Sequence, residues 1–325
     1  MAEGAAKMDE HQSEGESEGV PEEFIETAQH PNEFDLNTLE PDTETIDLTH
    51  CRIDAVPDFD RFTQLKDLSL RQNLLKSITN LRAVTLTALD LYDNQLTVIE
   101  GLDALVNLEH LDLSYNRLRK LEGLNNLRKL RLLYLVHNKI SKIEGLEAQT
   151  EVEMLELGDN RIRKIEGIAH MTKLRQLFLG KNKITKLENL DTLTALEQLS
   201  VPGNRLVKIE GISKLTNLAE LYLSDQGIST IEGLEGLTEL TLIDLANNPL
   251  TTLNGVDHLQ KLEDLWMNDN KIADWAEVDK LAKLAGLRTV YLERNPIYLK
   301  DISNYRRKVI MALPQVTQID ATACR

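Results

Sequence analysis

The sequence predicts an α/β solenoid, a horseshoe of about twelve stacked coils with one parallel sheet on its concave face. A pattern of the form LxLxxN recurs from residue 46 onward, and nine of its eleven steps are 22 residues long. Aromatic residues make up only 4% of the chain, so aliphatic side chains must fill the core. A fixed period of this length is typical of repeat architectures. The asparagine of the pattern, or its substitute, lies at Cys51, Asn73, Asn94, Asn116, Asn138, Asn160, Asn182, Asn204, Gln226, Asn248, Asn270 and Asn295.

Each repeated position has a physical reason. In segments such as LEHLDLSYNRLRKLEGL, the two leucines of LxL point inward because side chains alternate along a strand. The asparagine amide can satisfy backbone groups where the chain leaves the strand. The glycine of the frequent EGL suits a tight corner. This pattern is the leucine-rich repeat.

The two ends of the array depart from the period. Residues 1–40 form an acidic tail that we expect to be disordered, because they combine dense like charge with few apolar residues. Residues 41–295 form the array, which begins with the degenerate strand TETIDLTHC, and residues 296–325 form the cap. In the cap, SNYRRKVIMAL, stopped by Pro314, predicts a helix that covers the last coil.

The last step of the ladder, 25 residues long, contains ADWAEVDKLAKLAGL. Its spacing predicts a short helical or 3-10 segment on the convex face, where such segments cross the solenoid opposite the strands. Trp275 lies five places after its ladder residue, at a position that points inward in the other repeats. We therefore expect this tryptophan to belong to the core.

Charge and cysteine content limit the partners and the compartment. The formal net charge is −16, of which residues 1–44 contribute −13, so we expect neither nucleic acid nor a membrane to bind the tail. No apolar run approaches the ~18 residues of a membrane-spanning helix, and the first residues have no apolar segment of a signal peptide. With only two cysteines and no cysteine-rich flanks, an intracellular, reducing location is expected.

The middle residue of each LxL faces outward and forms a column along the concave face. The column contains five acidic residues, five aromatic residues and two serines, and no basic residue. Strand propensity accounts for one or two outward aromatics but not for such a series. Aromatic anchors beside charge are typical of a protein-binding surface. Its members are Asp47, Ser69, Asp90, Asp112, Tyr134, Glu156, Phe178, Ser200, Tyr222, Asp244, Trp266 and Tyr291, with Asp264 beside Trp266.

A second, basic column follows the ladder directly. It consists of Arg117, Lys139, Arg161, Lys183 and Arg205, with Lys271 later. A nucleic-acid stripe is one interpretation. A solvated rim that balances the carboxylates is favoured, because we expect no aromatic residue to interleave with these cations as a stacking platform.

Enzyme signatures are absent from the sequence: it has no glycine-rich phosphate loop, no HExxH and no CxxC. His110, Asp112 and His137 could approach one another, but no fourth ligand is evident, so we expect no metal and no cofactor.

The twelve LxLxxNxIxxIEGL repeats and the ending YRRKVIMALPQVTQIDAT resemble the leucine-rich-repeat regulatory subunits of protein phosphatase 1, the subunit 7 family. The resemblance covers about residues 41–325. It implies that the concave face binds the phosphatase catalytic subunit. Many other regulators of this enzyme dock through a short motif in which Val or Ile lies two residues before Phe or Trp. No Phe or Trp in this sequence has Val or Ile at that spacing. The protein-binding residues that we expect are Asp112, Tyr134, Glu156, Phe178, Tyr222, Asp244, Asp264, Trp266 and Tyr291. Tyr134 departs from the family, which has Phe at that position.

The resemblance implies a non-catalytic scaffold of the nucleus and cytoplasm that regulates the activity, maturation or location of the phosphatase. It also implies a ternary complex with a further phosphatase regulator. The alternative is a nuclear RNA-associated scaffold that uses the basic column.

Overall fold

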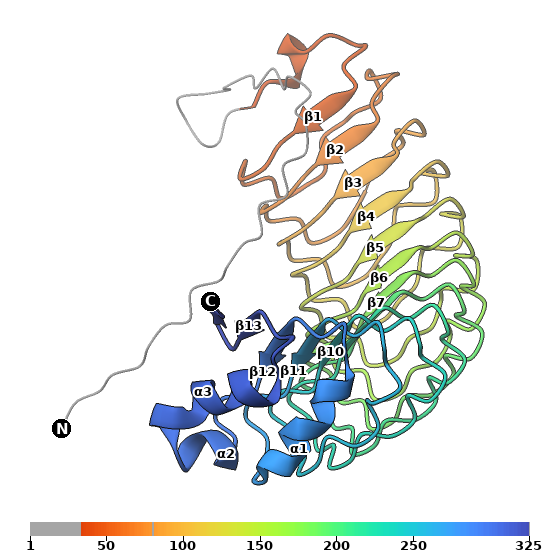
Figure 1. Ribbon diagram of the computed structural model, residues 1–325. Coiled ribbons are helices and arrows are strands. Elements are labelled where there is room, and N and C mark those ends of the chain that lie inside the picture. Colours follow the sequence, from red (N-terminus) through yellow and green to blue (C-terminus); the bar gives the residue numbers. More distant parts are fainter. Residues whose placement is uncertain (1–33, 80, 325) are drawn as a thin grey trace, which may run out of the picture.

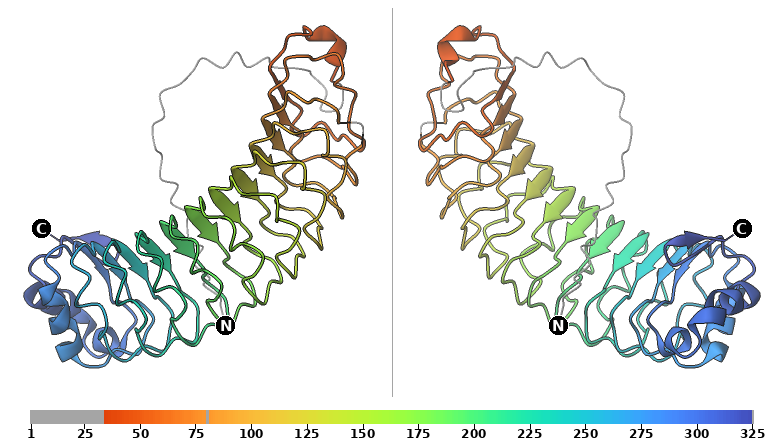
Figure 2. Two further views of the ribbon diagram at one scale, coloured as in Figure 1. Left: turned by 90° about the vertical axis from the view of Figure 1, so that its right-hand side faces the viewer. Right: turned by 90° about the vertical axis from the view of Figure 1, so that its left-hand side faces the viewer.

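The computed structural model describes residues 34–79 and 81–324, which form a curved stack of coils with the strands on its inner side (Figures 1 and 2). One sheet contains fourteen strands in sequence order. Strands β1 to β13 pair in parallel, as the repeat predicted for the array, and among the described residues only β13–β14 is antiparallel. The strands are β1 Thr45–Asp47, β2 Asp67–Ser69, β3 Ala88–Asp90, β4 His110–Asp112, β5 Leu132–Tyr134, β6 Met154–Glu156, β7 Gln176–Phe178, β8 Gln198–Ser200, β9 Glu220–Tyr222, β10 Leu242–Asp244, β11 Asp264–Trp266, β12 Thr289–Tyr291, β13 Gln318–Ile319 and β14 Thr322–Ala323.

The core is a continuous column of aliphatic side chains behind the sheet. In a typical repeat, Leu111 and Leu113 are fully buried on either side of Asp112, which faces the concave side. The later aliphatic residues of the same repeat, such as Leu118 and Leu121, close the coil from behind. Because each coil buries its apolar edges only against its neighbours, the stack needs a cover at both ends.

The asparagine ladder bonds backbone groups as expected. Asn160 donates from Nδ2 to the carbonyl oxygens of Leu157, at 3.1 Å, and of Leu135 in the preceding coil, at 2.9 Å. Its Oδ1 accepts from the amide of Ile140 at 3.0 Å. Each ladder amide thus joins two coils and satisfies buried polar groups. At the first position, the Cys51 thiol replaces the amide and makes one long contact with the Thr49 carbonyl, at 3.6 Å.

The glycine of EGL is required by its backbone. Gly145 has φ of +67°, and a Cβ atom there would lie 2.2 Å from the carbonyl oxygen of Leu121. Asn189 replaces this glycine in the ENL repeat and keeps the left-handed backbone, with φ of +60°. Its side chain donates to the Ile165 carbonyl at 2.7 Å, which bonds a neighbouring coil as the ladder does.

Among the described residues of the array, helices on the convex side are confined to the last repeat, where α1 (Trp275–Asp279) leads into η2 (Lys280–Lys283). In the other repeats this side consists of successive turns, such as that in which the Leu105 amide bonds the Leu102 carbonyl. Trp275 begins α1, is half-buried and packs against the core, so it lies at the edge of the core and not inside it as expected. Its ring packs against Tyr305, with 6.3 Å between ring centroids, and Val278 fills the interior instead.

Both ends of the array are covered. At the start, η1 (Leu36–Thr38) and Phe34 pack against the first coil, so part of the expected tail belongs to the folded array; residues 1–33 of that tail lie outside the described residues. At the end, α2 (Pro296–Leu299) and α3 (Ile302–Ala312) cover the last coil, with Tyr305 buried, as predicted for the cap. Of the helices described, none has the length and apolarity to cross a membrane.

Candidate functional site: the concave column

The strand pairing places the outward residues in one register. Asp112 pairs with Tyr134, Tyr134 with Glu156, and Glu156 with Phe178. The same register continues through Tyr222, Asp244, Trp266 and Tyr291, as far as β12. Asp264 opens β11, so it lies in the neighbouring column on the same face. The residues predicted for protein binding therefore form one surface of the folded chain.

The carboxylates of this column are held by backbone amides two residues further along. The amide of Ser114 donates to Asp112 Oδ1 at 2.8 Å, that of Gly158 to Glu156 Oε1 at 2.9 Å, and that of Ala246 to Asp244 Oδ1 at 2.9 Å. These bonds fix each side chain where the strand ends. An acidic residue in the column thus has a structural role as well as a charge.

Three of these carboxylates are desolvated by burial. Burial raises the pKa of Asp112 and of Asp244, and it raises the pKa of Glu156 from 4.5 to about 7. Within the described part of the chain, none of the three forms an ion pair. Asp90, further along the column, pairs instead with Arg71 at 2.9 Å. A buried unpaired carboxylate attracts an incoming cation strongly, because little water screens it.

The carboxyl-terminal third of the column is an aromatic cluster. The Trp266 ring lies edge-on to Tyr222 and to Tyr291, with centroids 6.2 Å and 5.8 Å apart. Asp244 lies on the strand between Tyr222 and Trp266 and is only 8% exposed, so the two rings meet across it. Of the nine residues predicted for protein binding, Asp244 alone is buried, although it lies in the outward column.

Trp266 itself is half-buried rather than directed into open solvent. Its indole Nε1 is buried and has no hydrogen-bond partner among the described residues. Buried donors without a partner are rare and cost free energy. The cluster therefore combines apolar surface with polar groups that are poorly satisfied in the free chain.

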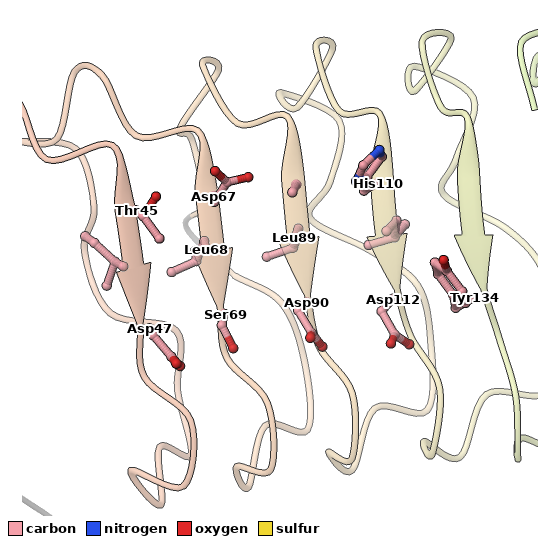
Figure 3. A pocket seen from close by; sticks show the side chains of 13 residues that line it. Thr45, Asp47, Asp67, Leu68, Ser69, Leu89, Asp90, His110, Asp112 and Tyr134 are labelled. Atoms are coloured by element: carbon pink, nitrogen blue, oxygen red, sulfur yellow. The ribbon is translucent and has the colours of Figure 1, made fainter. Parts of the chain in front are cut away.

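The amino-terminal third of the concave face is acidic. A hollow of about 350 Å³ extends from β1 to β5, and Figure 3 shows Asp47, Ser69, Asp90 and Asp112 side by side along it. His110 lies at the opposite end of the strand from Asp112 (Figure 3). Among the described residues there is no group of three or more side chains that could hold a metal ion.

The two edges of the sheet differ in charge pairing. Along the edge before the strands, cations and carboxylates alternate: Arg131 lies 3.0 Å from Glu153, and Arg175 lies 2.5 Å from Glu197. The basic column after the strands forms no such pairs: within the described part of the chain, Arg117 and its equivalents make neither an ion pair nor a side-chain hydrogen bond. The basic column was interpreted as a rim that balances the carboxylates, but its side chains make no direct contact with carboxylates in the described part of the chain.

Sequence reasoning missed an aromatic stack beside this basic column. Tyr115 stacks on His137 with 4.7 Å between ring centroids, and both line a hollow of about 320 Å³ together with Arg117 and Lys139. Aromatic residues therefore do accompany the basic column, and the sequence-based prediction that none does was wrong. Tyr115 and His137 both lie directly before a ladder asparagine, and this shared position was the signal that could have found them.

Comparisons with known protein families agree with the repeat architecture. A model described as "Leucine Rich repeats (2 copies)" matches residues 84–126, 106–148 and 150–192. A second model, "Leucine-rich repeat", matches residues 197–325, which includes the cap.

Three curated relatives are regulatory subunits by name. A "Protein phosphatase 1 regulatory subunit SDS22 homolog" of Caenorhabditis elegans is 56% identical over 89 residues, which are 26% of this chain and 27% of the relative. "Protein phosphatase 1 regulatory subunit 7" is 59% identical over 51 residues in Danio rerio, covering 16% of this chain and 14% of that protein. The Homo sapiens protein of the same name is 54% identical over 54 residues, covering 17% and 14%. These alignments thus span about a quarter or less of the relatives' own length.

Solved structures share the fold over most of the chain. An internalin, InlF, from Listeria monocytogenes superimposes with a TM-score of 0.75 at 25% identity, covering 85% of this chain and 79% of that one. The leucine-rich repeat domain of APL1B gives a TM-score of 0.66 at 21% identity and covers 91% and 90%. The chain is a leucine-rich-repeat protein, and part of it is similar in sequence to regulatory subunits of protein phosphatase 1.

Proposed function

We propose that this chain is a non-catalytic regulatory subunit that binds the catalytic subunit of protein phosphatase 1 through its concave column. The observation that carries the proposal is that carboxylates and aromatic rings suited to a protein partner lie together on the concave face. Two desolvated carboxylates that form no ion pair within the described residues, Asp112 and Glu156, lie in register with half-buried rings that a partner can cover. The names of the curated relatives supply the identity of the partner.

In the complex, Trp266, Phe178, Tyr222, Tyr291 and Tyr134 provide apolar contact area. Truncation of such anchors near the centre of an interface costs ~2 kcal/mol or more. Basic groups of the phosphatase pair with the carboxylates, which recovers the free energy that their burial costs in the free chain. Asp244 takes part only if the rings of Tyr222 and Trp266 separate, and Asp264 extends the surface beside them.

The proposal includes the setting in which the subunit acts. Binding regulates the activity, maturation or location of the phosphatase in the nucleus and cytoplasm, in a ternary complex with a further phosphatase regulator. Cys51 and Cys324 are both free, as a reducing compartment permits. Microscopy of the tagged full chain tests the location, and the proposal is wrong on this point if the signal lies in secretory compartments.

The experiment is capture of the purified phosphatase catalytic subunit by the full chain and by the variants Trp266→Ala and Glu156→Ala. We expect each variant to weaken binding at least ~10-fold, the equivalent of ~1.4 kcal/mol. Glu153→Gln is the matched control, because Glu153 lies three residues from Glu156 but pairs with Arg131 at the edge. Circular dichroism establishes that all variants are folded. Wild-type affinity in both column variants would exclude the concave column as the binding surface.

A further inference from the structure

One side wall of the solenoid carries a basic patch that the proposed function does not use. We define the basic wall as the residues one, three and four places after five successive ladder asparagines, Asn116, Asn138, Asn160, Asn182 and Asn204. Twelve of these fifteen positions hold Lys or Arg and none holds Asp or Glu, in a chain whose net charge is −16. All fifteen side chains are exposed or half-exposed, because buried residues such as Leu118 and Leu121 alternate with them.

The repeat itself does not require these cations. In the preceding repeat the same three positions hold Gln95, Thr97 and Val98, and in the repeat after the wall they hold Gly227, Ser229 and Thr230. The basic wall is therefore a local feature of five coils with neutral coils on either side. Since neighbouring strands lie ~4.8 Å apart, it extends ~19 Å along the solenoid across four gaps.

The inner part of the basic wall is electrostatically unsatisfied. The outermost lysines reach acidic residues at the glycine corner, as Lys142 does with Glu144 at 2.9 Å. Arg161 and Arg163 in the next coil make no ion pair within the described part of the chain, and Lys183 and Arg205 also make none. A series of unpaired cations at one-coil spacing fits an extended polyanion that runs along the solenoid.

The neighbouring aromatic stack argues against a single-stranded nucleic acid. The Arg71 guanidinium lies 4.1 Å from the centroid of the Tyr92 ring, Tyr92 lies 4.8 Å from Tyr115, and Tyr115 stacks on His137. His137 Nδ1 in turn bonds Asp159 at 2.5 Å. Binding of single strands relies on free aromatic faces for bases. Here the Tyr115 ring lies between Tyr92 and His137, so neither of its faces is free to receive a base, and charge is the main recognised feature of the wall, which favours an acidic polypeptide.

We propose that the occupant is the acidic amino-terminal segment of this chain, residues 1–33, docked on the basic wall. This segment contains ten Asp or Glu residues and one Lys. The concave face repels it, because five of the twelve column residues are acidic and none is basic. The basic wall offers charge of the opposite sign over a length that an extended acidic segment can follow.

The segment is long enough to reach. The described chain begins at Phe34, just before β1, and the basic wall lies beside β4 to β8, so the far end is seven strand gaps or ~34 Å away along the sheet. A chain of 33 residues has a root-mean-square span of ~30 Å as a flexible coil and reaches ~110 Å when extended. The extended length therefore also allows the segment to pass to the edge where the strands end, while the coil span covers the nearer coils of the basic wall. Because the segment is tethered, its effective concentration at the wall is in the range of ~mM.

This inference is independent of the proposed phosphatase binding. Its consequence is that the tail screens the basic wall, so that an anionic partner must displace it. The test uses the full chain with one nitroxide label on Ser17→Cys, in a background of Cys51→Ser and Cys324→Ser. The measurement is paramagnetic relaxation enhancement of backbone amide signals. In about 0.1 M salt, where the Debye length is ~10 Å, we expect enhancement at amides of the basic wall; in about 1 M salt, where it is ~3 Å, we expect its loss.

A matched pair of charge-reversal variants separates the basic wall from net charge. Arg163→Glu, Lys183→Glu and Arg205→Glu together should reduce the enhancement to its high-salt level. The control variant changes the net charge by the same amount at exposed positions outside the wall, and it should leave the enhancement intact. It carries Lys214→Glu, Lys283→Glu and Lys300→Glu. An unchanged amide spectrum elsewhere shows that both variants are folded. Absence of enhancement at the wall in low salt, or equal loss in both variants, would overturn the proposal.

Discussion

Glu156 should make the free chain less stable, and its replacement by Gln tests this directly. Glu156 lies between Tyr134 and Phe178 in the column, its carboxylate accepts one hydrogen bond from the Gly158 amide, and no cation compensates it within the described residues. Gln has the same shape and keeps that hydrogen bond. The substitution therefore removes the buried charge with little other change.

The magnitude follows from the pKa of Glu156, which burial raises from 4.5 to about 7. Because the folded pKa of this acid is above its unfolded value, its contribution to the free energy of unfolding becomes more unfavourable as pH rises from about 4.5 to about 7. At ~1.36 kcal/mol per pH unit, the Glu156 charge lowers the free energy of unfolding by ~3 kcal/mol at most. Partial exposure to water reduces the destabilisation that we expect to about 1–2 kcal/mol. Glu156→Gln should thus be more stable than wild type at pH 8 and equally stable at pH 4.

Glu153 provides a control of opposite sign on the same segment. Its hydrogen bonds with Arg131 lower the pKa of this carboxyl, so it contributes stability that is present above pH 4.5 and is lost as pH falls. Glu153→Gln should be slightly less stable than wild type at pH 8, by less than ~1 kcal/mol because the pair is exposed.

Urea unfolding followed by circular dichroism between pH 4 and 8.5 measures both variants. A difference between Glu156→Gln and wild type that does not change with pH would refute the assignment of an uncompensated carboxylate. Destabilisation of this variant at pH 8 would refute it as well.

Two further predictions concern the framework, and urea unfolding measures both. Asn160→Ala removes the amide that bonds two coils and should lower the free energy of unfolding by about 3–5 kcal/mol, because buried backbone groups lose their partners. Asn126→Ala, which removes an exposed contact with the Asp103 carbonyl, should cost less than ~0.5 kcal/mol; equal costs would contradict the role of the ladder. Gly145→Ala should cost about 2–4 kcal/mol, because the added Cβ meets a carbonyl oxygen at 2.2 Å on a left-handed backbone. Gly236→Ala, where the nearest atom lies at 3.3 Å and φ is not left-handed, should cost ~1 kcal/mol or less, and a larger loss there than at Gly145 would refute the argument.

The sequence was sufficient to predict the fold and the membership of the concave column. A fixed period together with side-chain alternation determines which residues share a register, so Asp112, Tyr134 and Glu156 could be aligned without coordinates. The asparagine ladder was predictable for the same reason, since each amide meets the same backbone groups in every coil.

The accessibility of individual column residues could not be predicted in this way. Alternation specifies that Asp244 points outward, but not that rings on the strands to either side fold over it. Aromatic side chains reach beyond the spacing of adjacent strands, so contacts between Tyr222 and Trp266 depend on side-chain rotamers. The inward position predicted for Trp275 was wrong for a related reason. The helix α1 begins at this residue, and on the helix the inward position belongs to Val278.

In each coil, different residues stabilise the stack and face the concave side, which explains how the concave face can carry polar groups that lower stability. The leucines, the asparagine amides and the glycine corners bond each coil to its neighbours, and stability in a solenoid is approximately a sum of such local and nearest-neighbour contributions. A desolvated carboxylate at Glu156 or an unpartnered indole at Trp266 subtracts from one coil while the contacts behind the sheet remain complete. If these two groups served the free chain, replacing them would destabilise it. If they serve a complex, replacing Glu156 should stabilise the free chain and weaken binding, and the opposite signs of these two effects would identify the column as a surface built for a partner.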